Sequence, residues 1–302
     1  MSQQPREHDD ESHWQAASSL EASSKTSLRR SRLASWMTDA EHGAGHLAAR
    51  VIVNRLWQHH FGRGLVATPN DFGASGERPS HPELLDWLAQ DLVAHGWQLK
   101  RLHKLIMTSS VYLQSAEFDE ARAKIDRENT YLWRHTPRRL EAEAIRDSML
   151  AVSREIDPTM YGPGTLDQNM RRRSVYFFIK RSQLIPTMML FDWPEHLVSI
   201  GQRASTTIAP QALLFMNSPQ GRQYAEGFAN RLSSVADGKF APAAYALAFG
   251  RQPNAKELAL AGQFLAKQAA AHAAAGKADA ARVARVDFCQ ALMSMNEFVY
   301  VE

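Results

Sequence analysis

Leucines at three- and four-residue steps constrain the fold of this chain more than any other feature. They are densest after Pro82, where four leucines fall on one face of an α-helix and polar residues fall on the other. Ser80 and Glu83 have capping-box spacing, and Pro82 in the first helical turn costs no internal hydrogen bond. Gly96 then supplies a residue that accepts the left-handed conformation of a helix end. The segment 82–95 is therefore predicted to be an amphipathic helix that packs on other elements.

The same periodicity recurs along most of the chain, and a strand pattern is almost absent. Only residues 174–180, SVYFFIK, are short, aromatic and β-branched in the manner of a strand. The sequence therefore predicts a mainly α-helical, irregular multi-helix protein with at most a short β-ribbon. The other predicted helices cover residues 27–40, 44–61, 99–113, 138–156, 210–216, 219–232, 256–275 and 280–295.

Two changes of composition divide the chain. Residues 1–26 are polar and have the composition of a disordered lead-in. The stretch DPTMYGPGTLDQNMRRR is rich in proline and glycine, as loops between subdomains are. We expect an N-terminal helical subdomain at 27–156, and a loop, a short strand and a C-terminal helical subdomain at 157–302.

Composition excludes several classes of protein. The only cysteine is Cys289, so an internal disulfide, a CxxC pair and a CxxCH haem attachment are all excluded. Lysine and arginine total 35 against 32 aspartate and glutamate, an excess too slight to indicate a nucleic-acid partner. Dinucleotide, P-loop and GxSxG motifs are absent. We therefore expect no cofactor, and nucleic acid is disfavoured as a partner.

The sequence also bears on compartment. No apolar run approaches the roughly 18–20 residues that a membrane helix needs, so no membrane span is expected. The N-terminus lacks the basic start and apolar middle of a signal peptide. A single cysteine suits either a cytosolic protein or a disulfide-free exported one. The chain is expected to be either cytoplasmic or a piece of a longer exported protein.

The connection between the helices predicted at 44–61 and 82–95 gathers charged and imidazole side chains. Arg55, Asp71, Glu77 and His81 could form an acid–base site, because a carboxylate beside an imidazole works as a general base in a cleft. The alternative is a structural corner in which Arg55 pairs with Asp71 or Glu77. We favour the corner, because TPNDFG has the chemistry of a turn.

Histidines are frequent, but their spacing does not suit a metal. Five of them fall within 45 residues, and neighbouring His59 and His60 project about 100° apart on a helix. The sequence has no HExxH motif, and these five histidines include no His-x3-His pair. No metal site is expected at these histidines: His59, His60, His81, His95 and His103.

The segment RRRSVYFFIKR combines cations with aromatic rings and contains no acidic residue. Interleaved rings and cations are typical of surfaces that bind single-stranded nucleic acid or an anionic glycan. The alternative is a buried strand with solvated charges at its ends, which we favour. The anion-binding candidates are Arg171, Arg172, Arg173, Lys180 and Arg181.

Several blocks of the sequence together resemble one known family. They are ARVIVNRLWQHHFGRGLVATPNDFGASGERPSHPELLDWLA, WQLKRLHKLIMTSSVYLQSA, PRRLEAEAIRDSML, RRSVYFFIKR, TTIAPQALLFMNSP and ALMSMNEFVYVE. From residue 27 to residue 302 they resemble a planctomycete-specific domain of unknown function. In that family the domain ends large, predicted secreted proteins that often contain a cytochrome c-like domain. The resemblance implies an exported setting, and it brings no activity or catalytic residue.

The absence of catalytic motifs favours a non-catalytic interaction or structural module of an envelope-associated assembly, so an enzyme is disfavoured. Its partner would be a separately encoded cytochrome c-like or other domain, or an anionic polysaccharide. One alternative is a hydrolase-like or carbohydrate-processing enzyme that uses Arg55, Asp71, Glu77 and His81. A second is binding of an anionic polymer or nucleic acid through residues 171–181.

Overall fold

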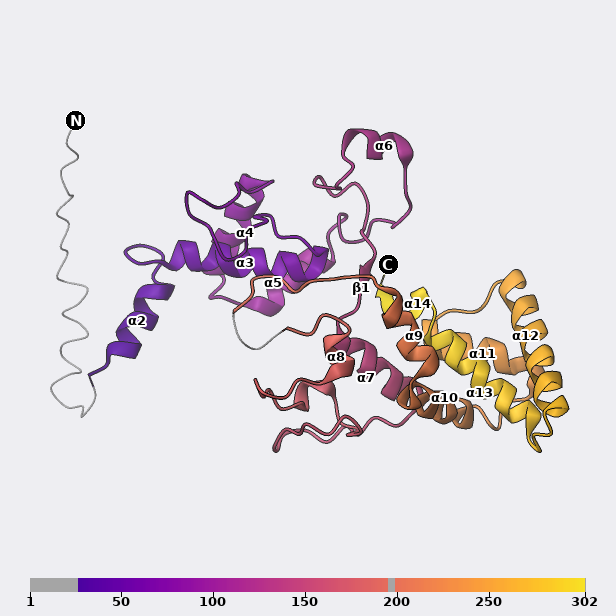
Figure 1. Cartoon of the computed structure of the whole chain (residues 1–302). Helices are drawn as coiled ribbons and strands as arrows, with labels where there is room; N and C mark the ends of the chain where they lie inside the picture. The colour runs from indigo at the N-terminus through magenta and orange to yellow at the C-terminus, as the bar shows by residue number, and fades with distance from the viewer. Residues whose placement is uncertain (1–26, 195–198, 302) are drawn as a thin grey trace. The chain divides into compact units, whose positions relative to one another are not determined.

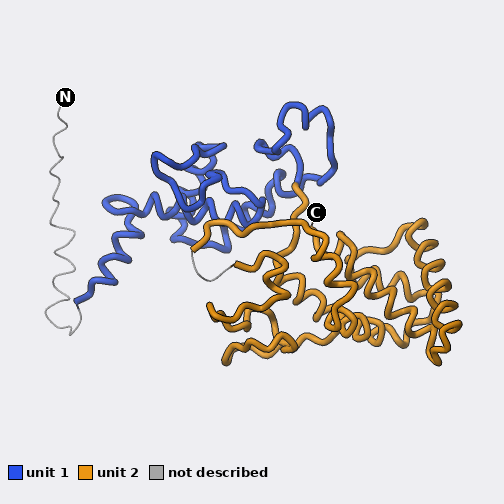
Figure 2. Tube along the Cα trace, in the orientation of Figure 1, with its two compact units in different colours: residues 1–135 blue, residues 136–302 orange. Residues whose placement is uncertain are grey.

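A computed structural model describes residues 27–194 and 199–301 of the chain (Figure 1). It divides into two compact units, unit 1 ending at His135 and unit 2 beginning at Thr136 (Figure 2). Within the described residues, no helix combines the length and apolar character needed to cross a bilayer. Residues 1–26, predicted as a polar lead-in, lie outside the described part of the chain.

Unit 1 is built on three helices that share one core. α3 (Gly45–Phe61) and α4 (Pro82–Ala94) pack along their apolar faces, and α5 (Leu99–Met107) closes the core with Leu102 and Ile106. Leu85, Leu88 and Leu92 are buried, as the spacing of leucines predicts. The other helices of this unit are α2 (Arg29–Thr38) and α6 (Glu120–Ile125).

The connection from α3 to α4 is held by main-chain groups and one buried amide. Asn54, which has no exposed surface, accepts a hydrogen bond from Val66 N at 2.8 Å and donates to Val66 O at 3.0 Å. Ser80 N donates to Leu65 O at 2.8 Å. The predicted capping box is wrong, because His81 occupies the N-cap position and the Ser80 hydroxyl bonds its Nδ1 at 2.9 Å instead. The Ser80 hydroxyl therefore does not cap the helix.

Unit 2 contains the larger core, in which Phe228, Phe240 and Cys289 are completely buried. A two-residue antiparallel ribbon pairs Arg138 with Val301 and Arg139 with Tyr300. The elements are β1 (Arg138–Arg139), α7 (Ala142–Val152), η1 (Ser174–Tyr176), α8 (Pro186–Met189), α9 (Ala209–Asn217), α10 (Pro219–Arg231), α11 (Asp237–Phe249), α12 (Ala255–Ala274), α13 (Ala280–Met293), α14 (Asn296–Val299) and β2 (Tyr300–Val301).

The predicted mainly α fold with a short ribbon is confirmed, and the strand predicted at 174–180 is wrong. That segment begins with the single 3-10 turn η1 and continues with isolated bridges, because Phe177 is buried while its neighbours Val175 and Phe178 face solvent. α11 was not predicted, since Pro242 lies inside it. The sequence placed residues 138–156 in the N-terminal subdomain, whereas α7 packs into the core of unit 2.

Candidate functional site

α7 separates two hollows of unit 2. Glu143, Ala144 and Asp147, spaced at helical intervals, face an open cleft. Arg146 and Met149 face a smaller pocket on another side of the helix. A helix of 11 residues thus supplies charged groups to both hollows, and the cleft is the larger of the two.

The cleft has a volume of about 450 Å³ and is lined by residues of unit 2. Three carboxylates and two guanidinium groups lie beside apolar side chains. This combination, a concave surface with a few convergent polar groups, is the usual form of a ligand site. The charged groups are Glu141, Glu143, Asp147, Arg173 and Arg203, and the apolar ones include Val175, Phe177, Ile179 and Trp193.

Glu143 is the most fully hydrogen-bonded carboxylate of the cleft. Arg203 approaches it in a fork, with Nη1 to Oε2 and Nη2 to Oε1 both at 2.8 Å, and Trp193 Nε1 donates to Oε1 at 2.8 Å. Burial alone would raise the pKa of Glu143, but the hydrogen bonds from Arg203 and Trp193 hold that pKa below its ordinary value. Glu143 is therefore ionised at neutral pH and its acceptor positions are largely occupied.

Asp147 is fixed by the segment that carries η1. Ser174 donates to Asp147 Oδ1 from both its backbone N and its hydroxyl, each at 2.7 Å. Arg173 Nε lies 3.6 Å from Asp147 Oδ2, and its side chain remains 66% exposed. Glu141 Oε2 lies 3.2 Å from Arg203 Nη1 and is 53% exposed. Glu143 and Asp147 are thus half-buried and hydrogen-bonded, while the more exposed Glu141 and Arg173 keep unused hydrogen-bonding capacity.

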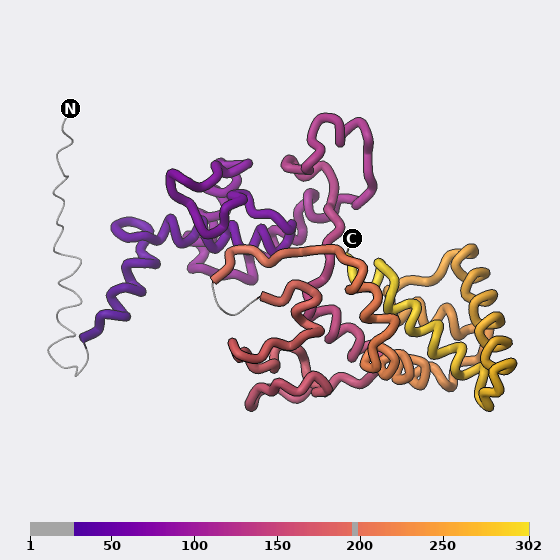
Figure 3. The backbone as a smooth tube through the Cα atoms, in the orientation of Figure 1, coloured from indigo at the N-terminus to yellow at the C-terminus, as the bar shows by residue number. Residues whose placement is uncertain are grey.

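Two carboxylates fasten residues 199–208, which have no regular secondary structure and lead into α9 (Figure 3). One is Glu143, which holds Arg203. The other is Asp192, which accepts from Thr206 N and Oγ1 at 2.8 Å and from Arg139 Nη2 at 2.5 Å. Although burial would raise its pKa, these hydrogen bonds keep the pKa of Asp192 below its ordinary value. The wall of the cleft is thus held by ion pairs.

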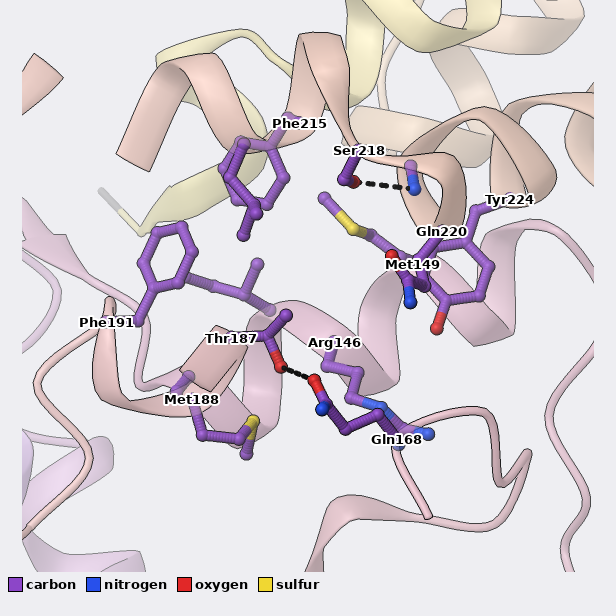
Figure 4. Close-up of a pocket in the computed structure, with 14 residues that line it drawn as sticks. Arg146, Met149, Gln168, Thr187, Met188, Phe191, Phe215, Ser218, Gln220 and Tyr224 are labelled. Carbon is purple, nitrogen blue, oxygen red and sulfur yellow. Dashed lines mark hydrogen bonds between the residues drawn. The ribbon is translucent and has the colours of Figure 1, made fainter. Parts of the chain in front are cut away.

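The smaller pocket is shown in Figure 4, with Phe191 and Phe215 on one side and Tyr224 on the other. Its volume is about 60 Å³, room for a few non-hydrogen atoms. Thr187 Oγ1 lies 3.4 Å from Gln168 Oε1 in its lining. This pocket is too small for a drug-sized ligand, for which sites measure about 300–1,000 Å³.

Arg146 extends from this pocket into the loop that precedes α8. Its Nη1 donates to Arg172 O and to Ser174 Oγ, both at 3.1 Å, and its Nη2 donates to Met170 O. The guanidinium lies 4.8 Å from the centre of the Phe177 ring. Burial lowers the pKa of Arg146 below its ordinary value. Arg146 therefore holds residues 170–174 of the loop through hydrogen bonds from its guanidinium.

The structure disperses the predicted anion-binding cluster. Arg171 pairs with Glu155 at 2.9 Å, and Arg173 lies beside Asp147 at the cleft. Arg172 donates to backbone carbonyls of the same loop, including Thr159 O at 3.2 Å, and covers the Tyr176 ring at 3.6 Å.

Among the described residues, Lys180 and Arg181 are the two members of that cluster that form neither an ion pair nor a side-chain hydrogen bond. Lys180 and Arg181 lie on an exposed turn closed by Gln183 N to Lys180 O at 3.1 Å. Arg172 and Arg146 occupy faces of the Tyr176 and Phe177 rings. A stacking platform across the whole segment is therefore not present.

The second predicted cluster is not brought together either. Arg55 is exposed and, among the described residues, forms no ion pair with Asp71 or Glu77. Asp71 Oδ1 instead accepts from Gly73 N at 2.8 Å, and Glu77 lies 3.6 Å from Arg63. The expected Arg55 pairing is wrong, because Arg63 lies nearer to the carboxylate. His81 bonds the adjacent Ser80 and packs edge-on against Tyr131.

The histidines do include one close pair. His60 Nε2 and His103 Nδ1, from α3 and α5, are 2.8 Å apart, and His60 packs edge-on against Tyr112. Within residues 27–194 and 199–301, no group of three or more His, Cys, Asp and Glu side chains is arranged to hold a metal ion.

Of the charged cleft residues only Arg173 was a candidate from the sequence, and the others were missed because no local motif joins them. Glu141, Glu143 and Asp147 resemble the solvent face of an amphipathic helix, and their partners Trp193 and Arg203 lie 50 and 60 residues beyond Glu143. The one available signal was the i, i+4 spacing of Glu143 and Asp147 on a helix with basic residues far along the chain.

A helical protein with a mixed-charge cleft is the class that the fold and the site define. Residues 29–265 match the family model PSD1, a protein of unknown function (DUF1553), and the chain belongs to that family. No curated protein and no solved structure matches the chain. The family supports the expected domain of unknown function and assigns no reaction.

Proposed function

We propose that the chain is a non-catalytic binding module and that its contact site is the cleft beside α7. The observation that carries this proposal is the state of Glu143 and Asp147. Each accepts at least two hydrogen bonds from protein donors: Glu143 from Trp193 and Arg203, and Asp147 from Ser174. Glu143 orients Arg203 and keeps little acceptor capacity for a substrate proton, and Asp147 holds Ser174 through its Oδ1.

Acid–base catalysis makes demands that this cleft meets poorly. A general acid at neutral pH needs a raised carboxyl pKa, whereas the pKa of Glu143 is lowered. A general base needs an oxygen that can reach the substrate, and both oxygens of Glu143 face Arg203. The arrangement supports recognition more than turnover.

The test combines binding with recovery of the probe. A thermal-shift screen of the purified chain with neutral oligosaccharides, heparin, nucleotides and divalent metals should find a probe that raises Tm, since a ligand bound only by the native state stabilises it. We expect that probe to be recovered chemically unchanged after prolonged incubation. Turnover that disappears in Glu143→Gln, a variant that keeps one acceptor oxygen, would refute the non-catalytic proposal.

The finer features of the family resemblance extend the proposal. The family that the sequence resembles is planctomycete-specific and often occurs with cytochrome c-like domains. That resemblance supports an exported, envelope-associated assembly with a separately encoded partner domain. Co-purification of the tagged chain from a cell-envelope fraction, with a haem protein identified by absorbance, would test this extension. A tagged chain recovered only from the cytoplasmic fraction would count against it.

A second candidate, contact with an anionic polymer, rests on Lys180 and Arg181. Both are exposed on one turn, outside the ion pairs that engage Arg171 and Arg173. Heparin binding should then weaken as salt rises, because each neutralised anionic group releases counterions. Lys180→Ala with Arg181→Ala should abolish it. Salt-independent binding would remove this candidate.

A further inference from the structure

We propose that the cleft beside α7 takes a neutral, hydroxyl-rich ligand with an apolar face, the chemistry of pyranose units in an oligosaccharide. This inference rests on the proposed binding function and names the ligand class of the same site. It follows from the volume of the cleft, the balance of its charges, and the exposed apolar side chains on its wall.

The volume fits a ligand of this size. The cleft measures about 450 Å³, within the range of about 300–1,000 Å³ typical of sites for small organic ligands. A single inorganic ion would leave most of it filled with water. The cleft is partly open to solvent, so a chain of several sugar units can extend beyond it.

The charges favour a ligand that is itself neutral. Three carboxylates and two guanidinium groups line the cleft. An anionic ligand would face Glu141, Glu143 and Asp147, and a cationic ligand would compete with Arg173 and Arg203 for the same carboxylates. A hydroxyl group donates to a carboxylate and accepts from a guanidinium, so it satisfies both kinds of group at once.

Two side chains at the mouth have capacity for such hydroxyls. Glu141 is 53% exposed and contacts Arg203 through one oxygen, Oε2. Arg173 contacts Asp147 through Nε, and its side chain is 66% exposed. Charged groups form hydrogen bonds roughly twice as strong as neutral ones, and arginine offers several donors in a planar fork. These two residues are the polar contacts that we assign to the ligand.

The apolar wall accounts for the preference for a sugar over a simple polyol. Val175 and Ile179 line the cleft and are 69% and 61% exposed. Burying such surface is favourable by about 25 cal/mol per Å² removed from water. A pyranose presents C–H groups on one face and hydroxyls at its edge. Its face can cover Val175 and Ile179 while its edge reaches Glu141 and Arg173.

Titration calorimetry with the full chain tests the proposal. The probes are neutral hexasaccharides of glucan, mannan, xylan, galactan and chitin type, with hexagalacturonate as the charged comparator. At least one neutral probe should bind, with an affinity that changes little between low and high salt, because no counterions are released. Glu141→Ala and Arg173→Ala should each weaken binding by about tenfold, the loss of one charge-assisted hydrogen bond.

Matched controls separate the cleft from general effects of charge. Arg171→Ala removes a cation two positions from Arg173 that pairs with Glu155 and does not line the cleft. Glu120→Ala removes an exposed carboxylate of unit 1. Both should bind like the parent, and circular dichroism should show that all four variants are folded.

Three results would overturn the inference: no binding of any neutral hexasaccharide, binding confined to hexagalacturonate with steep salt dependence, or equal affinity of the parent and the Glu141→Ala and Arg173→Ala variants. The proposed function fails differently. A neutral probe that binds and is cleaved supports the ligand class and refutes the non-catalytic module. If the chain binds no sugar but is stabilised by another probe that is recovered unaltered, the non-catalytic module is supported and this ligand class is refuted.

Discussion

The connection between α3 and α4 and the surroundings of α7 solve the same problem by different means. Each holds a long irregular segment against a helix. In unit 1 the tie is the neutral Asn54, buried and bonded twice to Val66. In unit 2 the ties are charged, with Arg146 inside the loop before α8 and Glu143 holding Arg203.

The difference teaches where pH and salt should act. A neutral amide pair does not titrate, so the α3–α4 connection should respond little to either variable. Partly buried ion pairs depend on the ionisation of both members, so the cleft of unit 2 should respond to acid. Unit 2 places its charges beside the candidate ligand site, and the connection in unit 1 leaves its ion pair Arg63–Glu77 at the surface.

The largest expected effect is at Arg146. Arg146→Ala leaves the carbonyls of Met170 and Arg172 and the Ser174 hydroxyl without their donor. It should destabilise unit 2 by about 3–5 kcal/mol, because each acceptor left unsatisfied costs about 1–3 kcal/mol. Urea unfolding followed by hydrogen exchange, which reports each unit separately, measures it. Arg181→Ala, an exposed cation, is the matched control. Equal stability of the two variants would show that the loop does not depend on Arg146.

Asn54 is the counterpart in unit 1. Asn54→Ala leaves Val66 N and O unpaired in a buried position, and each such group costs about 1–3 kcal/mol. We expect a loss of about 2–3 kcal/mol of stability in unit 1, with the same loss at neutral and acidic pH. Hydrogen exchange of residues 62–81 would measure it. A loss that varied steeply with pH would break the contrast between the two regions.

Acid should act on unit 2 first. The folded pKa of both Glu143 and Asp192 is lowered, so their stabilising contribution is complete above the unfolded carboxyl pKa of about 4 and is lost as pH falls through the folded value. Glu143→Gln should remove about 1–2 kcal/mol at neutral pH and should flatten the acid dependence of unit 2. Identical pH profiles for the parent and Glu143→Gln would contradict this assignment.

Periodicity predicted most of the helices, because an apolar stripe is a local property of the sequence. It located α4 and α7 to within a few residues. It missed α11, because Pro242 inside that helix is a residue that usually ends one. It predicted a strand at 174–180, because aromatic residues are common both in strands and in buried turns. Local pattern does not specify which residues a turn buries.

Most of the candidate site could not be predicted from the sequence, for a related reason. A cleft depends on which distant segments meet, and Trp193 and Arg203 reach Glu143 only after the chain has folded. The residues of each predicted cluster lie near one another in the sequence, but the structure does not bring them together. Arg171 to Arg173 point to three separate partners, and Arg55 is separated from Asp71.

The smallest expected effect lies at Arg55 and Asp71, where the sequence predicted an ion pair. A buried Arg55–Asp71 pair would make each alanine variant costly and the double variant less than additive. In the structure Arg55 is exposed and Asp71 bonds Gly73 N, so Arg55→Ala should change the free energy of unfolding by less than about 0.5 kcal/mol. Asp71→Ala should cost about 0.5–1.5 kcal/mol through its turn hydrogen bond. The double variant should equal the sum. A coupling above about 1 kcal/mol in the urea-unfolding cycle would restore the ion pair, and with it the argument for a site in that connection.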